Sequence, residues 1–341
     1  MDIGKKIKQL RNEKGLTQET VAAALSVSPQ AVSKWENGIT LPDIVLLPAL
    51  STYFGVSLDE LFDLSDETRL ERIQNMLWDE RILPQNTIRT ETAFLLEHAK
   101  AHPEDPKAYT LLAQMENHLA KTHHQQAADY ARQAILRNPE EKTAHSELVE
   151  AEGGRHADWY YATHHHLINW YQAFVKQHPT YRSGYMWLMD QLIDDYRFEE
   201  ASCYLDQMAQ IDTTFRTPLY RGKIAWMAGK QEEAFVIWDR MCEEFGQDWL
   251  TWLCMGDNLA RAGRFEEAKR YYKKALEIQP VPKYVDALES IAQICEREEK
   301  NEEAIQALEE ELVILKEQWD TTIGETADKI HREIARLKKL L

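Results

Sequence analysis

The segment SVSPQAVSKWENG, residues 26–38, decides the fold of the first part of the chain. Ser28 before Pro29 is typical of a helix start, because a serine side chain caps free backbone amides and proline needs no amide donor at the first helical position. Gly38 is typical of the residue that follows a helix. The segment therefore predicts a short helix between Pro29 and Gly38.

The predicted helix has two unlike faces. Val32 and Trp35 lie three residues apart, as core residues on one face do. The opposite face carries polar side chains that are long enough to reach base edges and phosphates. These side chains are Gln30, Ser33, Lys34 and Asn37. The outward face is therefore a candidate recognition surface.

The preceding segment, GLTQETVAAAL over residues 15–25, repeats the pattern of a break, a cap and an apolar stripe. Thr17 is the candidate cap, and Val21 and Leu25 belong to the stripe. Two short helices joined by a tight turn, with the small Ala22 at their crossing, describe a helix-turn-helix.

Residues 3–62 as a whole resemble the Xre/Cro/phage-repressor family. The resemblance rests on LRNEKGLTQ, VSKWENG, PDI and YFGVSLDELF. It implies a five-helix, lambda-repressor-like DNA-binding domain, in which the second helix clamps a phosphate and the third enters the major groove. It also implies a partly buried salt bridge between Arg11 and Glu36. The candidate DNA-binding residues are Gln18, Ser28, Pro29, Gln30, Ser33, Lys34 and Asn37.

Two positions depart from the family pattern. Ser26 stands where the family usually has a turn glycine, and a left-handed conformation there costs a serine roughly 1 kcal/mol. Pro29 replaces a long polar side chain at the first base-reading position. Specificity is therefore expected to depend on Gln30, Lys34 and DNA shape.

The distribution of charge limits DNA binding to this first part. The chain has 341 residues, enough for two or three domains, and a net charge of −17. Its first 65 residues hold six basic and eight acidic side chains, so the remainder is strongly acidic and should repel DNA. The lysines that could form a basic face are Lys5, Lys6, Lys8, Lys14 and Lys34.

Residues 249–280 resemble a tetratricopeptide repeat. The spacing of their large and small residues fits a hairpin of two helices, in which Gly256 and Ala268 allow close approach. Weaker copies flank this one, and their alanines at 201, 234, 268 and 304 lie 33, 34 and 36 residues apart, which is solenoid spacing. A further copy, with a longer loop between its helices, is expected to end at Pro139. Residues 158–179 are expected to form one long aromatic-rich helix.

The predicted organisation is all-α. Residues 1–64 form the helix-turn-helix domain, 65–86 a linker helix or a dimer contact, 87–320 the TPR-like α-solenoid, and 321–341 a capping helix. The four cysteines show no metal spacing and are expected to be buried thiols. No long apolar run or signal peptide is found, so a soluble cytoplasmic protein with no membrane partner is expected.

Histidines offer the strongest alternative chemistry. Eleven of the twelve lie between residues 98 and 178. His98 and His102 have a helical spacing that can share a metal ion. However, no glutamate is placed between them in the manner of zinc proteases, no cysteine is near, and residues 164–166 point in three directions. The expectation is no metal, no cofactor and no enzyme, with metal-dependent catalysis kept as a hypothesis to test.

The inner curve of the solenoid is a candidate ligand groove. In the repeat frame Trp226 falls on that side, among charges of both signs, which suits an extended peptide. The alternative is a groove filled by the protein's own helices or by a dimer partner. The other candidate groove residues are Met186, Asp190, Lys223, Asp257 and Arg261.

These features predict a bacterial transcriptional regulator. It is expected to bind a palindromic double-stranded DNA operator as a homodimer, and its TPR-like domain is expected to dimerise or to sense a peptide or protein ligand. The two domain types resemble those of the peptide-pheromone-receptor regulators of Gram-positive bacteria. The alternative is a DNA-tethered interaction scaffold without a small ligand. Whether the protein represses or activates is left open.

Overall fold

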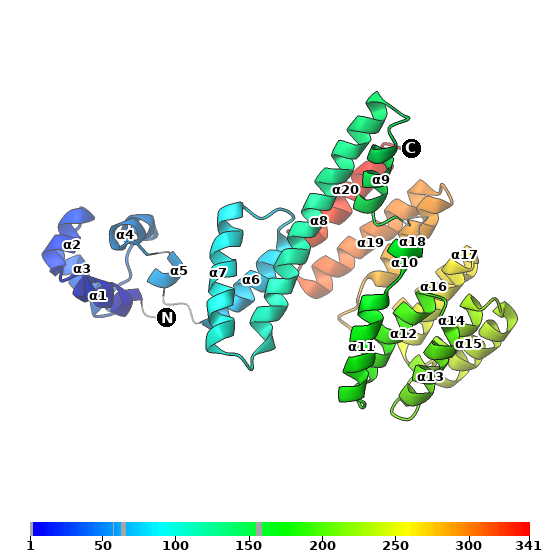
Figure 1. Cartoon of the computed structure of the whole chain (residues 1–341). Coiled ribbons are helices and arrows are strands. Elements are labelled where there is room, and N and C mark those ends of the chain that lie inside the picture. The colour runs from blue at the N-terminus through cyan, green and yellow to red at the C-terminus, as the bar shows by residue number, and fades with distance from the viewer. Residues whose placement is uncertain (1–2, 57, 63–65, 155–158) are drawn as a thin grey trace. The chain divides into compact units, whose positions relative to one another are not determined.

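The computed structural model describes residues 3–56, 58–62, 66–154 and 159–341. Over these residues every regular element is a helix, which confirms the predicted all-α class (Figure 1). The chain divides into two compact units, Met1–Lys121 and Thr122–Leu341, and the division falls inside one long helix.

The first unit begins with the predicted five helices of the DNA-binding domain. Their inward side chains form one hydrophobic core, in which Val21, Val32 and Leu50 are fully buried and Trp35 is 5% exposed. The elements are α1 (Ile3–Glu13), α2 (Gln18–Ala24), α3 (Pro29–Glu36), the 3₁₀ turn η1 (Ile44–Leu46), α4 (Leu47–Phe54) and α5 (Leu58–Leu61).

The helix starts follow the sequence signals. The Thr17 hydroxyl accepts a hydrogen bond from the amide of Thr20, and the Ser28 hydroxyl accepts one from the amide of Ala31. Ser26, in the turn between α2 and α3, has φ +56°. The expected left-handed serine is therefore confirmed.

Two longer helices and the first part of a third complete the first unit, which ends at Lys121. The three helices are α6 (Asp66–Asp79), α7 (Gln85–Ala101) and α8 (Pro106–Arg137). Leu70 and Ile73 of α6 are buried in one cluster with Leu95 of α7 and Met115 of α8. The expected hairpin ending at Pro139 is wrong, because α8 is one continuous helix of 32 residues. The sequence after Pro106 holds no glycine or proline that would break it before residue 138.

The second unit consists of helical hairpins (Figure 1). Before the hairpins come α9 (Lys142–Ala151), α10 (Trp159–Ala162) and α11 (His165–Gln177). The four hairpins are α12 (Arg182–Asp194) with α13 (Phe198–Met208), α14 (Arg216–Met227) with α15 (Gln231–Phe245), α16 (Trp249–Arg261) with α17 (Phe265–Ile278), and α18 (Asp286–Arg297) with α19 (Asn301–Trp319). The last helix, α20 (Glu325–Lys338), packs on α19.

The expected single helix over residues 158–179 is wrong. Its described part forms two helices, α10 and α11, separated at Thr163 and His164. The backbone N–H of His164 donates to an Asp195 carboxylate oxygen at 2.9 Å, and the His164 ring contacts the same carboxylate at 2.6 Å. Because this amide bonds to a side chain instead of a carbonyl of the preceding turn, the helix is interrupted there.

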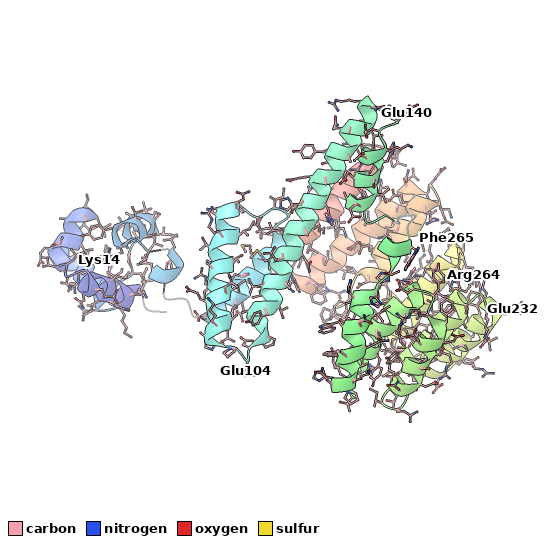
Figure 2. The ribbon with its side chains drawn as sticks, viewed as in Figure 1. Lys14, Glu104, Glu140, Glu232, Arg264 and Phe265 are labelled. Carbon is pink, nitrogen blue, oxygen red and sulfur yellow. The ribbon has the colours of Figure 1, made fainter. Side chains whose placement is uncertain are left out.

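Each hairpin turns in the same way. The turn residue has a positive φ, and the alanine five positions later is fully buried. At the turn between α16 and α17 the Arg264 amide donates to the Leu259 carbonyl at 2.9 Å. Arg264 and Phe265, the first residue of α17, are labelled in Figure 2. The turn residues are Tyr196, Gly229, Gly263 and Glu299, and the alanines are Ala201, Ala234, Ala268 and Ala304. The buried alanines thus mark the repeat register that the sequence predicted.

Two glycines allow a hairpin's helices to approach closely. A Cβ on Gly222 would lie 2.1 Å from the indole nitrogen of Trp238, and one on Gly256 would lie 2.6 Å from the ring of Tyr272. Neither distance is compatible with a side chain, so the packing of the large ring requires the glycine opposite it. The packing role expected for Gly256 is confirmed.

Two further expectations concern cysteines and membranes. Cys242 and Cys295 are buried, but Cys254 is half-buried and Cys203 is exposed, so the expectation of four buried thiols is wrong for Cys203 and Cys254. Cys203 lies on α13 outside the apolar stripe that faces the core. Among the described residues, no helix combines the length and the apolar character needed to cross a membrane.

Candidate nucleic-acid interface and ligand groove

The outward face of α3 is polar and accessible. Pro29, Gln30, Lys34 and Asn37 are exposed, and Ser33 is half-buried between them. The Asn37 side chain donates to the Ser33 carbonyl at 2.8 Å, which holds it at the end of the helix. Ser28 is exposed at the other end, with its hydroxyl used as the cap. The candidate base-reading residues therefore share one face, opposite the core residues.

A buried ion pair fixes the orientation of this face. Arg11 of α1 donates through Nη2 to Glu36 Oε2 at 2.9 Å, and the Glu36 side chain is only 1% exposed. Gln18 Nε2 donates to the same carboxylate at 2.7 Å. Burial raises the pKa of Glu36, but the hydrogen bonds from Arg11 and Gln18 outweigh burial and hold it below its usual range. The three side chains connect α1, α2 and α3.

The role predicted for Gln18, a phosphate clamp, stays a prediction. The side chain is half-buried at the first position of α2, where helix amides also favour an anion. A glutamine amide nitrogen carries two N–H groups, so its bond to Glu36 is compatible with a phosphate contact.

Sequence reasoning missed an apolar surface next to α3. Ile39, Leu41, Ile44 and Val45 are 67–78% exposed. The small domain therefore exposes apolar area beside the candidate recognition helix. The signal was present in the run ITLPDIV, whose apolar residues show neither helical nor strand spacing.

The second unit contains a groove where the sequence predicted one. A pocket of about 380 Å³ is lined by residues of α12, α14 and α16 together with Trp238 of α15. Asp190 Oδ1 accepts a hydrogen bond from the Tyr220 hydroxyl at 2.9 Å and lies 3.7 Å from Lys223 Nζ. The lining residues are Asp190, Ile193, Asp194, Lys223, Trp226, Met227, Trp238, Asn258 and Arg261.

Four of the six candidate groove residues line this pocket, namely Asp190, Lys223, Trp226 and Arg261. Asp257 lines a neighbouring pocket with Arg261 and accepts a hydrogen bond from the Tyr272 hydroxyl at 2.8 Å. Met186 is not among the lining residues of either pocket and packs against the core. Burial raises the pKa of Asp190 and of Asp257.

The sequence did not single out Asn258. This side chain lines the pocket, yet the residue is only 4% exposed, and its Nδ2 has no hydrogen-bond partner among the described residues. A buried amide without a partner is costly, so it indicates a place where a ligand carbonyl would be favourable. The repeat frame places it next to Asp257, but no sequence signal distinguishes a paired asparagine from an unpaired one.

Comparison with known families agrees with both predicted domain types. A helix-turn-helix family model matches residues 7–61, and a tetratricopeptide-repeat model matches residues 250–317. The first match contains α2 and α3, and the second contains the hairpins α16–α17 and α18–α19.

Several similar curated proteins are HTH-type transcriptional regulators. The chain is 40% identical over 75 residues to the HTH-type transcriptional activator BcrR of Enterococcus faecalis, a match covering 22% of this chain and 37% of BcrR. It is 42% identical over 66 residues to the regulator y4dJ of Sinorhizobium fredii, covering 19% of this chain and 86% of y4dJ. It is 30% identical to the regulator ImmR of Bacillus subtilis, covering 29% of this chain and 88% of ImmR. The chain belongs to the helix-turn-helix transcriptional regulators.

Solved structures superpose only loosely. A tetratricopeptide repeat protein from Parabacteroides merdae covers 80% of this chain at 13% identity with a TM-score of 0.40. Bacillus thuringiensis PlcR, in complex with the peptide PapR7 and DNA, covers 98% at 11% identity with a TM-score of 0.30. At these scores neither likeness adds to the family matches.

Proposed function

We propose that this DNA-binding regulator is a homodimer that reads a palindromic operator in the cytoplasm, where the chromosome lies, and that its groove binds a peptide or a segment of a partner protein. We also propose that residues 1–64 act as the DNA-binding domain and 65–86 as a linker helix. Residues 87–320 would then act as the TPR-like solenoid and 321–341 as its capping helix. The observation that carries the ligand proposal is the pocket between α12, α14 and α16, with its unpaired Asn258.

The proposed DNA contact follows from the polar face of α3. Gln30 and Lys34 are exposed beside each other, on a helix whose orientation is fixed by Arg11 and Glu36. Gln18 and the exposed lysines of α1 would contact phosphates, so affinity should fall steeply as salt rises. Operator selection followed by a gel-shift titration tests this. Gln30→Ala should relax discrimination at particular base pairs, whereas Gln18→Ala should weaken all sequences alike.

Dimerisation follows from the size of the reading surface. One such domain reads about half a site, and specific affinity requires two domains about one helical turn apart. The dimer contact is expected in the repeats or in α6, and the apolar surface of Ile39, Leu41, Ile44 and Val45 is a third candidate. Light scattering of the full chain, before and after Ile44→Ser with Val45→Ser, tests whether this apolar surface forms the contact. A monomer with a half-site footprint would contradict the proposal.

The groove suits an extended chain of amino acids. It offers an aromatic side chain, Trp226, which contacts Phe235 and Trp238 edge-on or tilted, so its ring is held in place. It offers charges of both signs and a volume within the range of ligand pockets. The amide of Asn258 would bind a ligand carbonyl, and Arg261 or Lys223 would bind a carboxylate.

Binding in the groove is proposed to change operator affinity. Each hairpin contacts mainly its neighbours, so a ligand that bridges three of them can alter the curvature of the stack. The effect must be reciprocal, with operator DNA changing ligand affinity by the same factor. Mass spectrometry of molecules that co-purify with the native protein identifies the ligand. Trp226→Ala should abolish co-purification and the ligand's effect on DNA binding, whereas Trp187→Ala, an exposed tryptophan outside the pocket, should not.

The alternative is a scaffold without a small ligand. In that case no small ligand would co-purify, and Trp226→Ala would leave operator affinity unchanged both in cell extract and in buffer. Neither role requires catalysis, and we propose none.

A further inference from the structure

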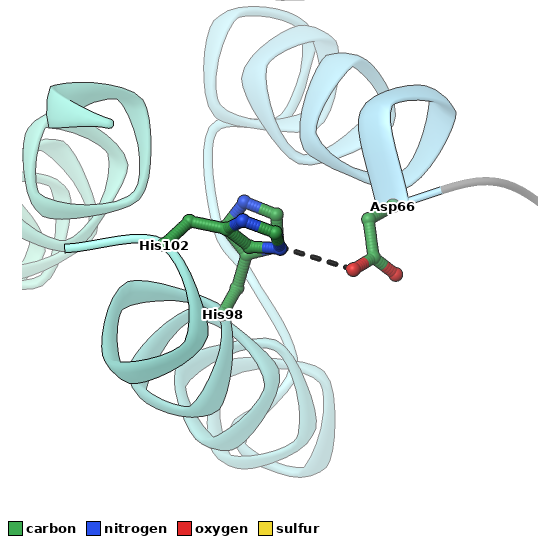
Figure 3. A group of neighbouring side chains, drawn as sticks. All are labelled: Asp66, His98 and His102. Carbon is green, nitrogen blue, oxygen red and sulfur yellow. Dashed lines mark hydrogen bonds and ion pairs between the residues drawn. The ribbon is translucent and has the colours of Figure 1, made fainter. Parts of the chain in front are cut away.

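Two helices of the first unit bring one carboxylate and two imidazoles together. His98 and His102 lie at the end of α7, and Asp66 is the first residue of α6 (Figure 3). One ligand atom from each of the three side chains can be chosen so that all lie within 4.8 Å of one another. His98 is buried, while Asp66 and His102 are exposed, so the cluster is anchored on one side and open to solvent on the other.

The distances fit a small ion. His98 Nδ1 lies 3.2 Å from Asp66 Oδ2. Two ligand atoms that are each about 2.1 Å from a tetrahedral ion lie about 3.4 Å apart, so little movement separates the present hydrogen bond from shared coordination. The rings of His98 and His102 have centroids 4.5 Å apart, and one ring nitrogen of each lies within 4.8 Å of the other and of an Asp66 oxygen.

A second carboxylate lies near the buried histidine. His98 Nε2 lies 3.7 Å from Asp105 Oδ2, and Asp105 Oδ1 accepts a hydrogen bond from the amide of Lys107 at 2.9 Å. Histidine ligands of metals commonly place a carboxylate at the nitrogen that does not bind the ion, which fixes the tautomer. At 3.7 Å this pair is longer than a hydrogen bond, so Asp105 lies on the Nε2 side of His98 while Nδ1 faces Asp66.

We propose that Asp66, His98 and His102 bind one divalent transition-metal ion, with Zn²⁺ the best match. Two imidazoles and one carboxylate are ligands that Zn²⁺ accepts, and solvent completes the coordination at the exposed side. The spacing of the two histidines suggested this chemistry, but the third ligand lies 32 residues before His98 and becomes visible only when α6 packs beside α7.

The ion would fasten the start of α6. Further along the same two helices, the buried Glu91 of α7 pairs with Arg69 and Arg72 of α6, both at 2.9 Å. Asp66 is joined to α7 by one hydrogen bond to a histidine, so metal binding would replace the weaker of the two attachments. The site is independent of the groove and of the DNA contact.

The test uses the metal-free full chain. We expect titration with Co²⁺ to give the visible absorption of a bound ion and calorimetry with Zn²⁺ to give one ion per chain. Asp66→Asn and His102→Ala, both at exposed positions that should not affect folding, are each expected to weaken Zn²⁺ binding at least tenfold. The matched control is His123→Ala with His124→Ala, two exposed histidines of α8 outside the cluster.

A second readout separates this site from general binding by the many histidines. Zn²⁺ should slow amide hydrogen exchange in the first turns of α6 in the wild type, and not in Asp66→Asn. The proposal is overturned if the wild type binds neither ion, if the two variants bind as the wild type does, or if the His123 and His124 control loses the ion instead.

Discussion

Two buried glutamates, one in each unit, have pKa values shifted in opposite directions. Glu36 and Glu311 are both 5% exposed. Arg11 and Gln18 bond to Glu36 and keep its pKa below the usual range despite burial. Burial raises the pKa of Glu311 to about 7, and its Oε2 has no partner among the described residues. Equal burial thus gives opposite behaviour, because a partner is present in one place and missing in the other.

The difference reflects how each unit is built. The DNA-binding domain must hold α3 in one orientation, and a charged carboxylate bound by α1 and α2 provides this. A repeat hairpin obtains its geometry from glycines, alanines and rings, and some of its charged pairs are local and exposed, although Lys269 at 9% exposed pairs with Glu298 of the next hairpin. Arg264 and Glu267, three residues apart at a hairpin turn, are an example of a local pair.

The largest effect is expected from removing the partner of Glu36. Arg11→Ala leaves a buried carboxylate without its cation and should cost about 3–5 kcal/mol of local stability. Hydrogen exchange in α1 and α3 measures this loss. Arg264→Ala, which removes an exposed local pair, should cost less than about 1 kcal/mol in α16 and α17. Similar losses of stability in both variants would show that the buried pair contributes no more than an exposed pair, contrary to the comparison drawn above.

The second expected effect concerns Glu311. Since the folded chain holds a proton there up to about pH 7, stability is full below the unfolded pKa of about 4.5 and falls as pH rises through 7. Glu311→Gln should therefore match the wild type near pH 4 and exceed it by about 3 kcal/mol near pH 8. Urea denaturation at the two pH values checks this. An equal difference at both would show that the carboxyl is not protonated in the fold.

The third test asks whether Lys34 contacts DNA without contributing to the position of α3, in contrast to the buried pair of Arg11 and Glu36. Lys34 is exposed, so Lys34→Ala should leave hydrogen exchange in α3 unchanged. It should lower operator affinity about tenfold and relax discrimination at one position. Lys14→Ala, on the loop before α2, serves as the comparison for a phosphate-only contribution. Unchanged affinity in a gel shift would remove α3 from the DNA interface.

The smallest effect is expected at the hairpin turns. Glu299 has φ +60° where the equivalent position in another hairpin is Gly263. Glu299→Gly relieves left-handed strain but frees the unfolded backbone, so a gain of about 0.5 kcal/mol is expected. Gly263→Ala should instead lose about 1 kcal/mol. Thermal denaturation of both variants measures how much the backbone conformation of the hairpin turns contributes to the stability of the repeats.

The sequence predicted most where the determinants are contiguous. The caps, the turn serine and the two faces of α3 lie within residues 17–38, and all were predicted. The repeat register was predicted because it recurs in buried alanines. Side-chain bonds between distant segments could not be predicted, such as the capture of the His164 amide by Asp195 or the approach of Asp66 to His98. The continuity of α8 was missed because the repeat pattern was extended into a stretch without breaking residues.

Because Trp238 packs directly against Gly222, a substitution at one position constrains which residues the other can hold. No side chain can be added at residue 222 while the indole remains, and a smaller residue at 238 alone would leave a cavity in the core. Related chains should therefore change the two positions together or keep both. The same applies to Gly256 and Tyr272. An alignment of homologues should show covariation within each pair, and the two hairpins should vary independently of each other.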